Sequence, residues 1–230
     1  MDLALVDPRP SAPTCSALRR FNLPLYYVCG LFFDFSVFFF WLILPIVLDE
    51  MRISPLLIGV ANALAFIVAG VFSPVAGYIA DVWLAEVVVA FGCVVQAATC
   101  VVTALLLLFD VGIIPLYVVL AVQGIGLALV WSPLAKLITD ESYDGEQNKN
   151  LANYEMVSAC GKAVGFLFGG SATRLIGQTY SLALAGGLAL IVFLLLPRFP
   201  VVRCTTASPT LPAQRKPSHP RTFFVTALIY

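Results

Sequence analysis

Long apolar segments separated by short polar connections make up most of this chain. A spanning helix needs about 20 apolar residues to cross about 30 Å of hydrocarbon. The predicted spanning helices cover Leu25–Val47, Leu57–Ile79, Leu84–Phe109, Ile113–Leu137, Leu151–Ile176 and Tyr180–Leu196. The fifth is the most polar and the sixth is the shortest. Because a membrane β-barrel would show short alternating segments instead, the pattern predicts an all-α polytopic transmembrane helix bundle.

The connections divide the chain into four regions. Residues 1–24 read as a tail and residues 25–196 as the six-helix bundle. Residues 197–220 mix Pro, Ser, Thr and Arg without hydrophobic periodicity, which is typical of a flexible linker. Residues 221–230 end on FFVTALIY, which reads as the start of a truncated seventh helix. The very short connections at 48–56, 80–83 and 110–112 predict that the helices they join pack as antiparallel hairpins.

Composition supports a multi-pass membrane protein, with the lipid bilayer as its surroundings. The chain is 60% hydrophobic and 11% charged, whereas soluble domains are about one quarter charged. Thirteen basic and thirteen acidic residues cancel, so the charge does not favour a nucleic-acid partner. Neither the six cysteines nor the single histidine, His219, shows the spacing of a metal site, and no cofactor is expected.

The basic residues predict the orientation in the membrane. With the N-terminus in the cytoplasm, Arg52 and Arg174 lie outside and Lys162 lies within the fifth helix. The remaining ten fall on the cytoplasmic side: Arg9, Arg19, Arg20, Lys136, Lys149, Arg198, Arg203, Arg215, Lys216 and Arg221. Cytoplasmic loops carry an excess of basic residues, so the N-terminus, the tail and the linker are predicted to be cytoplasmic.

The stretch VAGYIADVWLAE falls in the predicted turn between the second and third helices. Its GYIAD, Gly77 to Asp81, resembles the G-x-x-x-D signature of the major facilitator superfamily of transporters. With six helices, a linker and the start of a seventh, the chain resembles the N-terminal half of such a transporter. The resemblance implies that Gly77 permits close helix packing and that Asp81 takes part in a cytoplasmic gate. The basic cluster that follows the aspartate in the family is replaced here by VWLAE.

Two further motifs resemble the family in part. Gln123 and Gly124 match a Gln-Gly pair in the fourth helix, with Leu120 where the family has arginine. GKAVGFLFGG in the fifth helix resembles a glycine-rich run, with Phe166 where the family has proline. Its glycines are interpreted as packing positions and are Gly161, Gly165, Gly169 and Gly170.

Asp34 and Lys162 are the opposite charges predicted to lie deep in the bilayer. They are at similar depths on two helices that both enter from the cytoplasm, so we expect them to meet near the midplane. One interpretation is a structural ion pair that holds the first helix against the fifth. The other is transport, with Asp34 coupling it to protons. Five neutral polar residues are interpreted as interhelical hydrogen-bonding groups: Asn62, Gln96, Thr99, Thr103 and Gln123.

The function that the resemblance implies is secondary active transport of a small solute by alternating access. Under this hypothesis the chain is an N-terminal fragment that needs a missing C-terminal half or a second copy. The alternative is a self-contained six-helix channel or scaffold without a transport cycle. An enzyme is not expected, because the chain has no GxSxG serine motif, no HExxH and no phosphate-binding loop.

Overall fold

The computed structural model describes residues 15–109, 111–143 and 145–196, and these form six α-helices. The helices are α1 (Cys15–Glu50), α2 (Pro55–Val82), α3 (Ala85–Leu108), α4 (Ile113–Glu141), α5 (Gln147–Ile176) and α6 (Gln178–Leu195). The predicted all-α bundle is confirmed. Helix α1 begins at Cys15, so the predicted boundary between residues 24 and 25 falls inside a helix. The predicted linker (197–220) and seventh-helix start (221–230) lie outside the described residues.

Most of the described helices are suited to a membrane. Five are long and apolar enough to cross one: α2, α3, α4, α6 and the Asn22–Glu50 part of α1. Helix α5 does not meet this criterion, although it has 30 residues, because polar residues recur along it. It nevertheless runs beside α1, with which it shares the most extensive helix contact of the bundle. The chain is a multi-pass membrane protein, as the sequence predicted.

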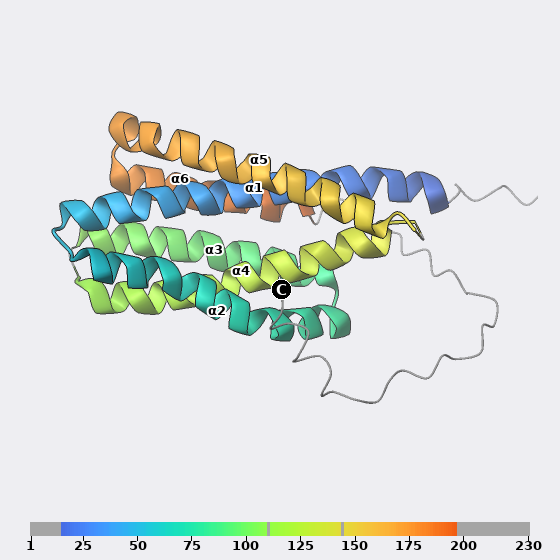
Figure 1. The fold of residues 1–230 in the computed structure, drawn as a ribbon, viewed down its shortest axis with the longest axis horizontal. Coiled ribbons are helices and arrows are strands. Elements are labelled where there is room, and N and C mark those ends of the chain that lie inside the picture. Colours follow the sequence, from blue (N-terminus) through green and yellow to red (C-terminus); the bar gives the residue numbers. More distant parts are fainter. Residues whose placement is uncertain (1–14, 110, 144, 197–230) are drawn as a thin grey trace, which may run out of the picture.

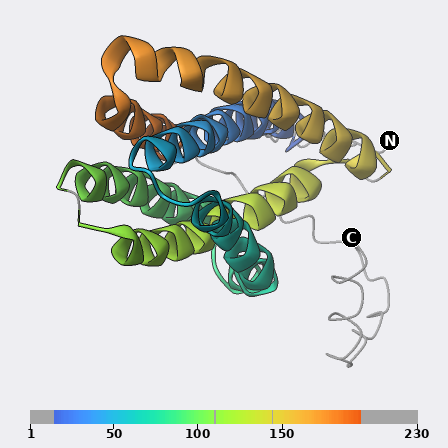
Figure 2. The same ribbon diagram turned by 60° about the vertical axis from the view of Figure 1, so that its left-hand side comes forward.

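Neighbours in the bundle are mostly not neighbours in the chain. Helix α1 packs on α5 and α6, α4 packs on α2 and α3, and α3 packs on α6. Figures 1 and 2 show the resulting arrangement, in which α1, α5 and α6 lie on one side and α2, α3 and α4 on the other. The hairpin prediction is right for α3 and α4. It is wrong for α1 with α2 and for α2 with α3, because those pairs share few contacts.

Residue size decides which helix lies at the centre. Helix α1 carries fully buried large side chains, among them Phe33, Phe40, Ile43 and Leu44. The buried residues of α2 are all alanine, at 61, 65, 69, 76 and 80, and form a narrow stripe. An alanine stripe lets one face of α2 approach α4 closely while its larger side chains point outward. Helix α1 therefore forms the core, and α2 lies at the edge.

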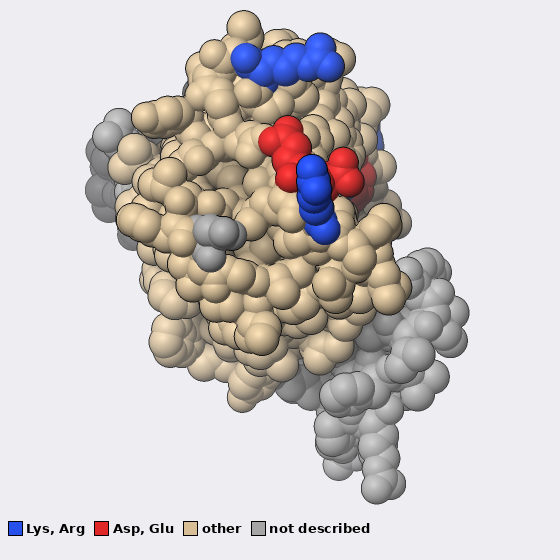
Figure 3. Space-filling view, turned by 90° about the vertical axis from the view of Figure 1, so that its left-hand side faces the viewer, with Lys and Arg blue, Asp and Glu red and all other residues tan. Residues whose placement is uncertain are grey.

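The two ends of the bundle differ in their connections. We call the end with the α2–α3 and α4–α5 connections the N-terminal end, and the end with the α1–α2, α3–α4 and α5–α6 connections the opposite end. The opposite end is largely uncharged, with a few acidic and basic side chains gathered on it (Figure 3). Between α5 and α6, the chain turns at Gly177, whose φ of 83° favours glycine.

Candidate functional site

A buried carboxylate lies where α1, α4 and α5 meet. Asp34 of α1 has no exposed surface and accepts two hydrogen bonds. Trp131 of α4 donates its indole N–H to Oδ1 over 2.9 Å, and the Ser158 hydroxyl of α5 is bonded to Oδ2. Burying an ionisable group within a membrane protein costs several kcal/mol unless partners satisfy it. The two bonds provide such partners, each from a different helix.

Aromatic packing sets the position of Trp131. Its ring stacks on Phe66 of α2 with centroids 6.3 Å apart, and Phe66 packs on Trp41 of α1 at 4.8 Å. Three aromatic side chains from three helices thus form a continuous row. Because this row restrains the indole, it orients the N–H that Asp34 accepts.

A small pocket lies against the donors of Asp34. Its volume is ≈ 260 Å³. It is lined by Trp131, Ala135, Tyr154, Glu155, Ser158 and Lys162. Trp131 and Ser158 therefore contact both the pocket and Asp34. A space of this size holds several water molecules, each of which needs roughly 30 Å³.

The expected ion pair between Asp34 and Lys162 is absent from the described residues. Lys162 lies within electrostatic range of Asp34 on the pocket wall. Its ammonium group instead lies over the ring of Phe38, 5.7 Å from the centroid. Lys162 therefore lies near Asp34, as expected, but Ser158 and Trp131 bind both carboxylate oxygens. The interpretation as a structural ion pair is therefore wrong for this conformation.

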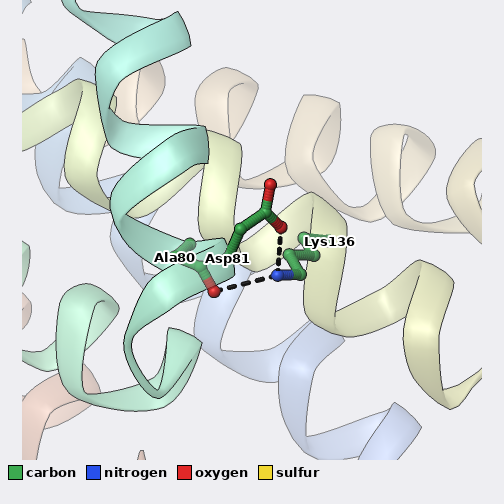
Figure 4. A network of polar contacts seen from close by, with 3 residues as sticks. All are labelled: Ala80, Asp81 and Lys136. Carbon is green, nitrogen blue, oxygen red and sulfur yellow. Dashed lines mark hydrogen bonds and ion pairs between the residues drawn. The ribbon is translucent and has the colours of Figure 1, made fainter. Parts of the chain in front are cut away.

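Asp81 has a partner that the sequence reasoning did not find. Lys136 of α4 forms an ion pair with Asp81 and donates a second hydrogen bond, over 2.9 Å, to the Ala80 carbonyl oxygen (Figure 4). The Asp81 side chain is 66% exposed and that of Lys136 is 31% exposed. The carbonyl belongs to the last turn of α2, where carbonyls lack intrahelical donors. Lys136 therefore supplies a cation where the family's basic cluster is missing, and it joins α2 to α4 at the N-terminal end.

The glycine of the same motif does not have the packing role that the resemblance implied. A Cβ on Gly77 would meet no atom within 4 Å, because this face of α2 has no close neighbour. Gly124 in the Gln-Gly pair does have such a role. A Cβ there would lie 2.4 Å from the carbonyl oxygen of Ala65, so Gly124 permits the close approach of α4 to α2.

Three of the four glycines in α5 pack tightly against α1. A Cβ on Gly161 would lie 2.5 Å from the carbonyl oxygen of Leu31, and one on Gly165 would lie 2.7 Å from that of Phe35. A Cβ on Gly169 would approach the Phe39 carbonyl oxygen to 3.2 Å. The contacts advance together along both helices, which therefore run parallel.

Gly170 does not belong to this seam. A Cβ there would meet only a methyl group of Leu42 at 3.8 Å, an ordinary contact. It follows Gly169 by one residue and so projects in another direction. Gly161, Gly165 and Gly169 therefore lie in the close contact with α1, and Gly170 lies outside it.

The neutral polar residues do not form the predicted interhelical bonds. Thr99 donates to the Gln96 carbonyl and the Gln96 amide to the Cys100 sulfur, both within α3. Several buried side-chain atoms have no hydrogen-bond partner in the described structure: Asn62 Oδ1, Gln96 Oε1, Thr103 Oγ1 and both amide atoms of Gln123. The bonds of Thr99 and Gln96 therefore stay within one helix, whereas interhelical bonds were predicted.

Sequence reasoning missed Trp131, Ser158 and Lys136. Ser158 is one turn before Lys162, on the same face of α5, and this spacing is a signal that the sequence contains. Lys136 shares a predicted membrane side with Asp81, so opposite charge at one end of the bundle could have indicated the pair. Trp131 gives no comparable signal, because it lies in a predominantly apolar segment, LALVWSPLA.

Comparison with known proteins agrees with this architecture. A family model described as Major Facilitator Superfamily matches residues 26–229, which is most of the chain. No curated protein sequence matches it. The matched range includes Asp34, the Asp81–Lys136 pair and the α5 glycine seam. The chain belongs to the major facilitator superfamily, a family of membrane transporters.

Proposed function

We propose that the chain is part of a secondary active transporter that moves a small solute by alternating access and couples this movement to protons through Asp34. The observation that carries the proposal is a fully buried carboxyl group without an ion pair among the described residues, whose donors line a pocket. Ionisable residues inside a membrane bundle commonly mark proton relays or ion pathways.

The partners of Asp34 suit a group that gains and loses a proton. Trp131 can only donate, so Oδ1 remains an acceptor in either state. The Ser158 hydroxyl can donate to a charged Oδ2 or accept from a protonated one. The hydrogen bond between Asp34 and Ser158 therefore survives protonation with the donor reversed. Because Ser158 also lines the pocket, its hydroxyl provides the route by which a water-borne proton reaches Oδ2.

The Asp81–Lys136 pair supports a gate at the N-terminal end, which we propose is cytoplasmic. An exposed ion pair contributes only about 0.2–1 kcal/mol, so thermal motion and solute binding can readily break it. A gate needs such a contact, because a strong one would hold a single conformation. Alternating access rocks two halves about a central site. The six helices therefore need a second half, supplied by further residues of the same polypeptide or by a second copy.

Proteoliposomes test the transport proposal. The chain is reconstituted with its second half, the vesicles are loaded with the pH-sensitive dye pyranine, and a panel of small solutes is added outside. We expect a subset of the solutes to drive proton entry that saturates with concentration. A steady conductance in planar bilayers made with the same preparation would instead indicate a channel.

We expect Lys136→Met to open the N-terminal end more than Asp81→Asn. The lysine change removes both the ion pair and the bond to Ala80, whereas the aspartate change leaves the bond to Ala80 in place. Hydrogen exchange of the backbone amides in the last turns of α2 measures the opening. Solute affinity should stay within about twofold in both variants, because neither side chain reaches the pocket at Asp34.

A double-mutant cycle isolates the pair. We expect a coupling free energy of about 0.2–1 kcal/mol between positions 81 and 136. Lys149→Met, which removes an exposed lysine elsewhere at the same end, is the matched control. Equal hydrogen exchange of the α2 amides in the Lys136→Met and Lys149→Met proteins would contradict the proposed gate. A loss of solute affinity in the Lys136→Met protein with unchanged hydrogen exchange would also contradict it.

A further inference from the structure

We infer that the solute is a small organic anion and that Lys162 binds its carboxylate; this inference rests on the proposed transport function. The side chain of Lys162 is half-buried, and its helix position is midway between the ends of α5 at Gln147 and Ile176. Among the described residues no ion pair includes it, and its ammonium group lies over the face of Phe38. A cation at this depth is costly unless an anion compensates it.

The two acidic residues near Lys162 do not neutralise its charge by direct contact. Both oxygens of Asp34 are bound by Trp131 and Ser158. Glu155 lies two turns before Lys162 on α5, which is roughly 10 Å away at 1.5 Å per residue, and its side chain is exposed. The ammonium group therefore faces a pocket in which neither acid neutralises it by direct contact. A carboxylate that enters the pocket gains a charge-assisted hydrogen bond, which is stronger than a neutral one.

The rest of the pocket defines the other end of the solute. Trp131 and Ala135 form an apolar wall on α4, opposite Lys162 on α5. A flat or aliphatic group that lies against the indole gains dispersion and hydrophobic energy. The volume of ≈ 260 Å³ is just below the range of drug-sized ligand pockets, which run from roughly 300 to 1,000 Å³. The pocket therefore fits a small carboxylate with one apolar face.

Asp34 connects this binding to the proton. While Asp34 is charged, it competes electrostatically for Lys162 and repels an incoming carboxylate. When it takes up a proton, both effects disappear, so the anion binds more tightly. The anion and the proton would therefore bind and cross together. Lys162 would bind the carboxylate, and Asp34 would carry the proton.

Equilibrium binding tests the inference without requiring transport. The chain in lipid nanodiscs is titrated calorimetrically with benzoate and lactate, and with their neutral counterparts benzamide and lactamide. We expect at least one carboxylate to bind at least about tenfold more tightly than its amide. Lys162→Gln should remove this preference, and Lys162→Arg should keep most of it because the cation remains. Asp34→Asn should bind the carboxylate severalfold more tightly than the unchanged protein.

The matched control is Lys149→Gln, which removes an exposed lysine between about three and four turns earlier on the same helix and should leave carboxylate affinity unchanged. Thermal unfolding of each variant shows that it is folded. Equal binding of acids and amides, or equal affinity in the Lys162→Gln and Lys149→Gln proteins, would overturn the inference and favour an acid of the second half as the partner of Lys162. Carboxylate binding without solute-driven proton flux would overturn the transport proposal alone.

Discussion

Gly165→Ala is expected to lower the free energy of unfolding of the bundle by about 1–3 kcal/mol, the usual cost of overpacking. The new methyl group would lie 2.7 Å from the Phe35 carbonyl oxygen and 2.9 Å from the Phe39 amide nitrogen. These are backbone atoms of α1, the central helix, and they cannot move aside as a flexible side chain can. The methyl group therefore forces α5 away from α1. Chemical unfolding in detergent measures the loss.

Two other glycines serve as controls, because alanine at these positions is not expected to lower stability. Gly77→Ala and Gly187→Ala place a methyl group where nothing lies within 4 Å. Each should keep or raise stability, because alanine favours a helix over glycine by about 0.5–1 kcal/mol. If Gly165→Ala were as stable as these two variants, the close approach of α5 to α1 would be wrong.

Asp34→Asn is expected to reduce solute-driven proton entry to background while the bundle stays folded. Asparagine has the same shape, its Oδ1 can accept from Trp131, and its amide can donate to the Ser158 oxygen. The side chain can no longer bind a proton, so the proposed coupling is lost. The pyranine assay measures proton entry. Binding of the solute, measured on the same vesicles, should persist.

Asp34→Leu separates this chemical effect from a structural one. Leucine leaves the indole N–H of Trp131 and the Ser158 hydroxyl without their partner, at a cost of about 1–3 kcal/mol for each buried group. We therefore expect Asp34→Leu to be less stable than Asp34→Asn, with both lacking proton entry. Normal proton entry in the Asp34→Asn protein would show that another group carries the proton.

The amino-acid sequence by itself determined that this is an all-α membrane bundle, because helix length and apolar content follow directly from the thickness of hydrocarbon. It also indicated the depth of Asp34 and Lys162, since the rise per residue of a helix is constant. The spacing of Gly161, Gly165 and Gly169 likewise placed these three glycines on one face of their helix. These are local properties, and neighbouring helices do not change them.

Which side chains meet was decided only by the tertiary structure. Depth along a helix does not specify rotation about its axis, so Asp34 was predicted beside Lys162 but bonds to Trp131 and Ser158. Short connections did not decide packing either, because α2 reaches across to α4 and leaves Gly77 uncovered. The same contact brings Lys136 to Asp81, which are 55 residues apart in the chain. Such pairings depend on the rotation and tilt of whole helices, which result from the packing of all six together.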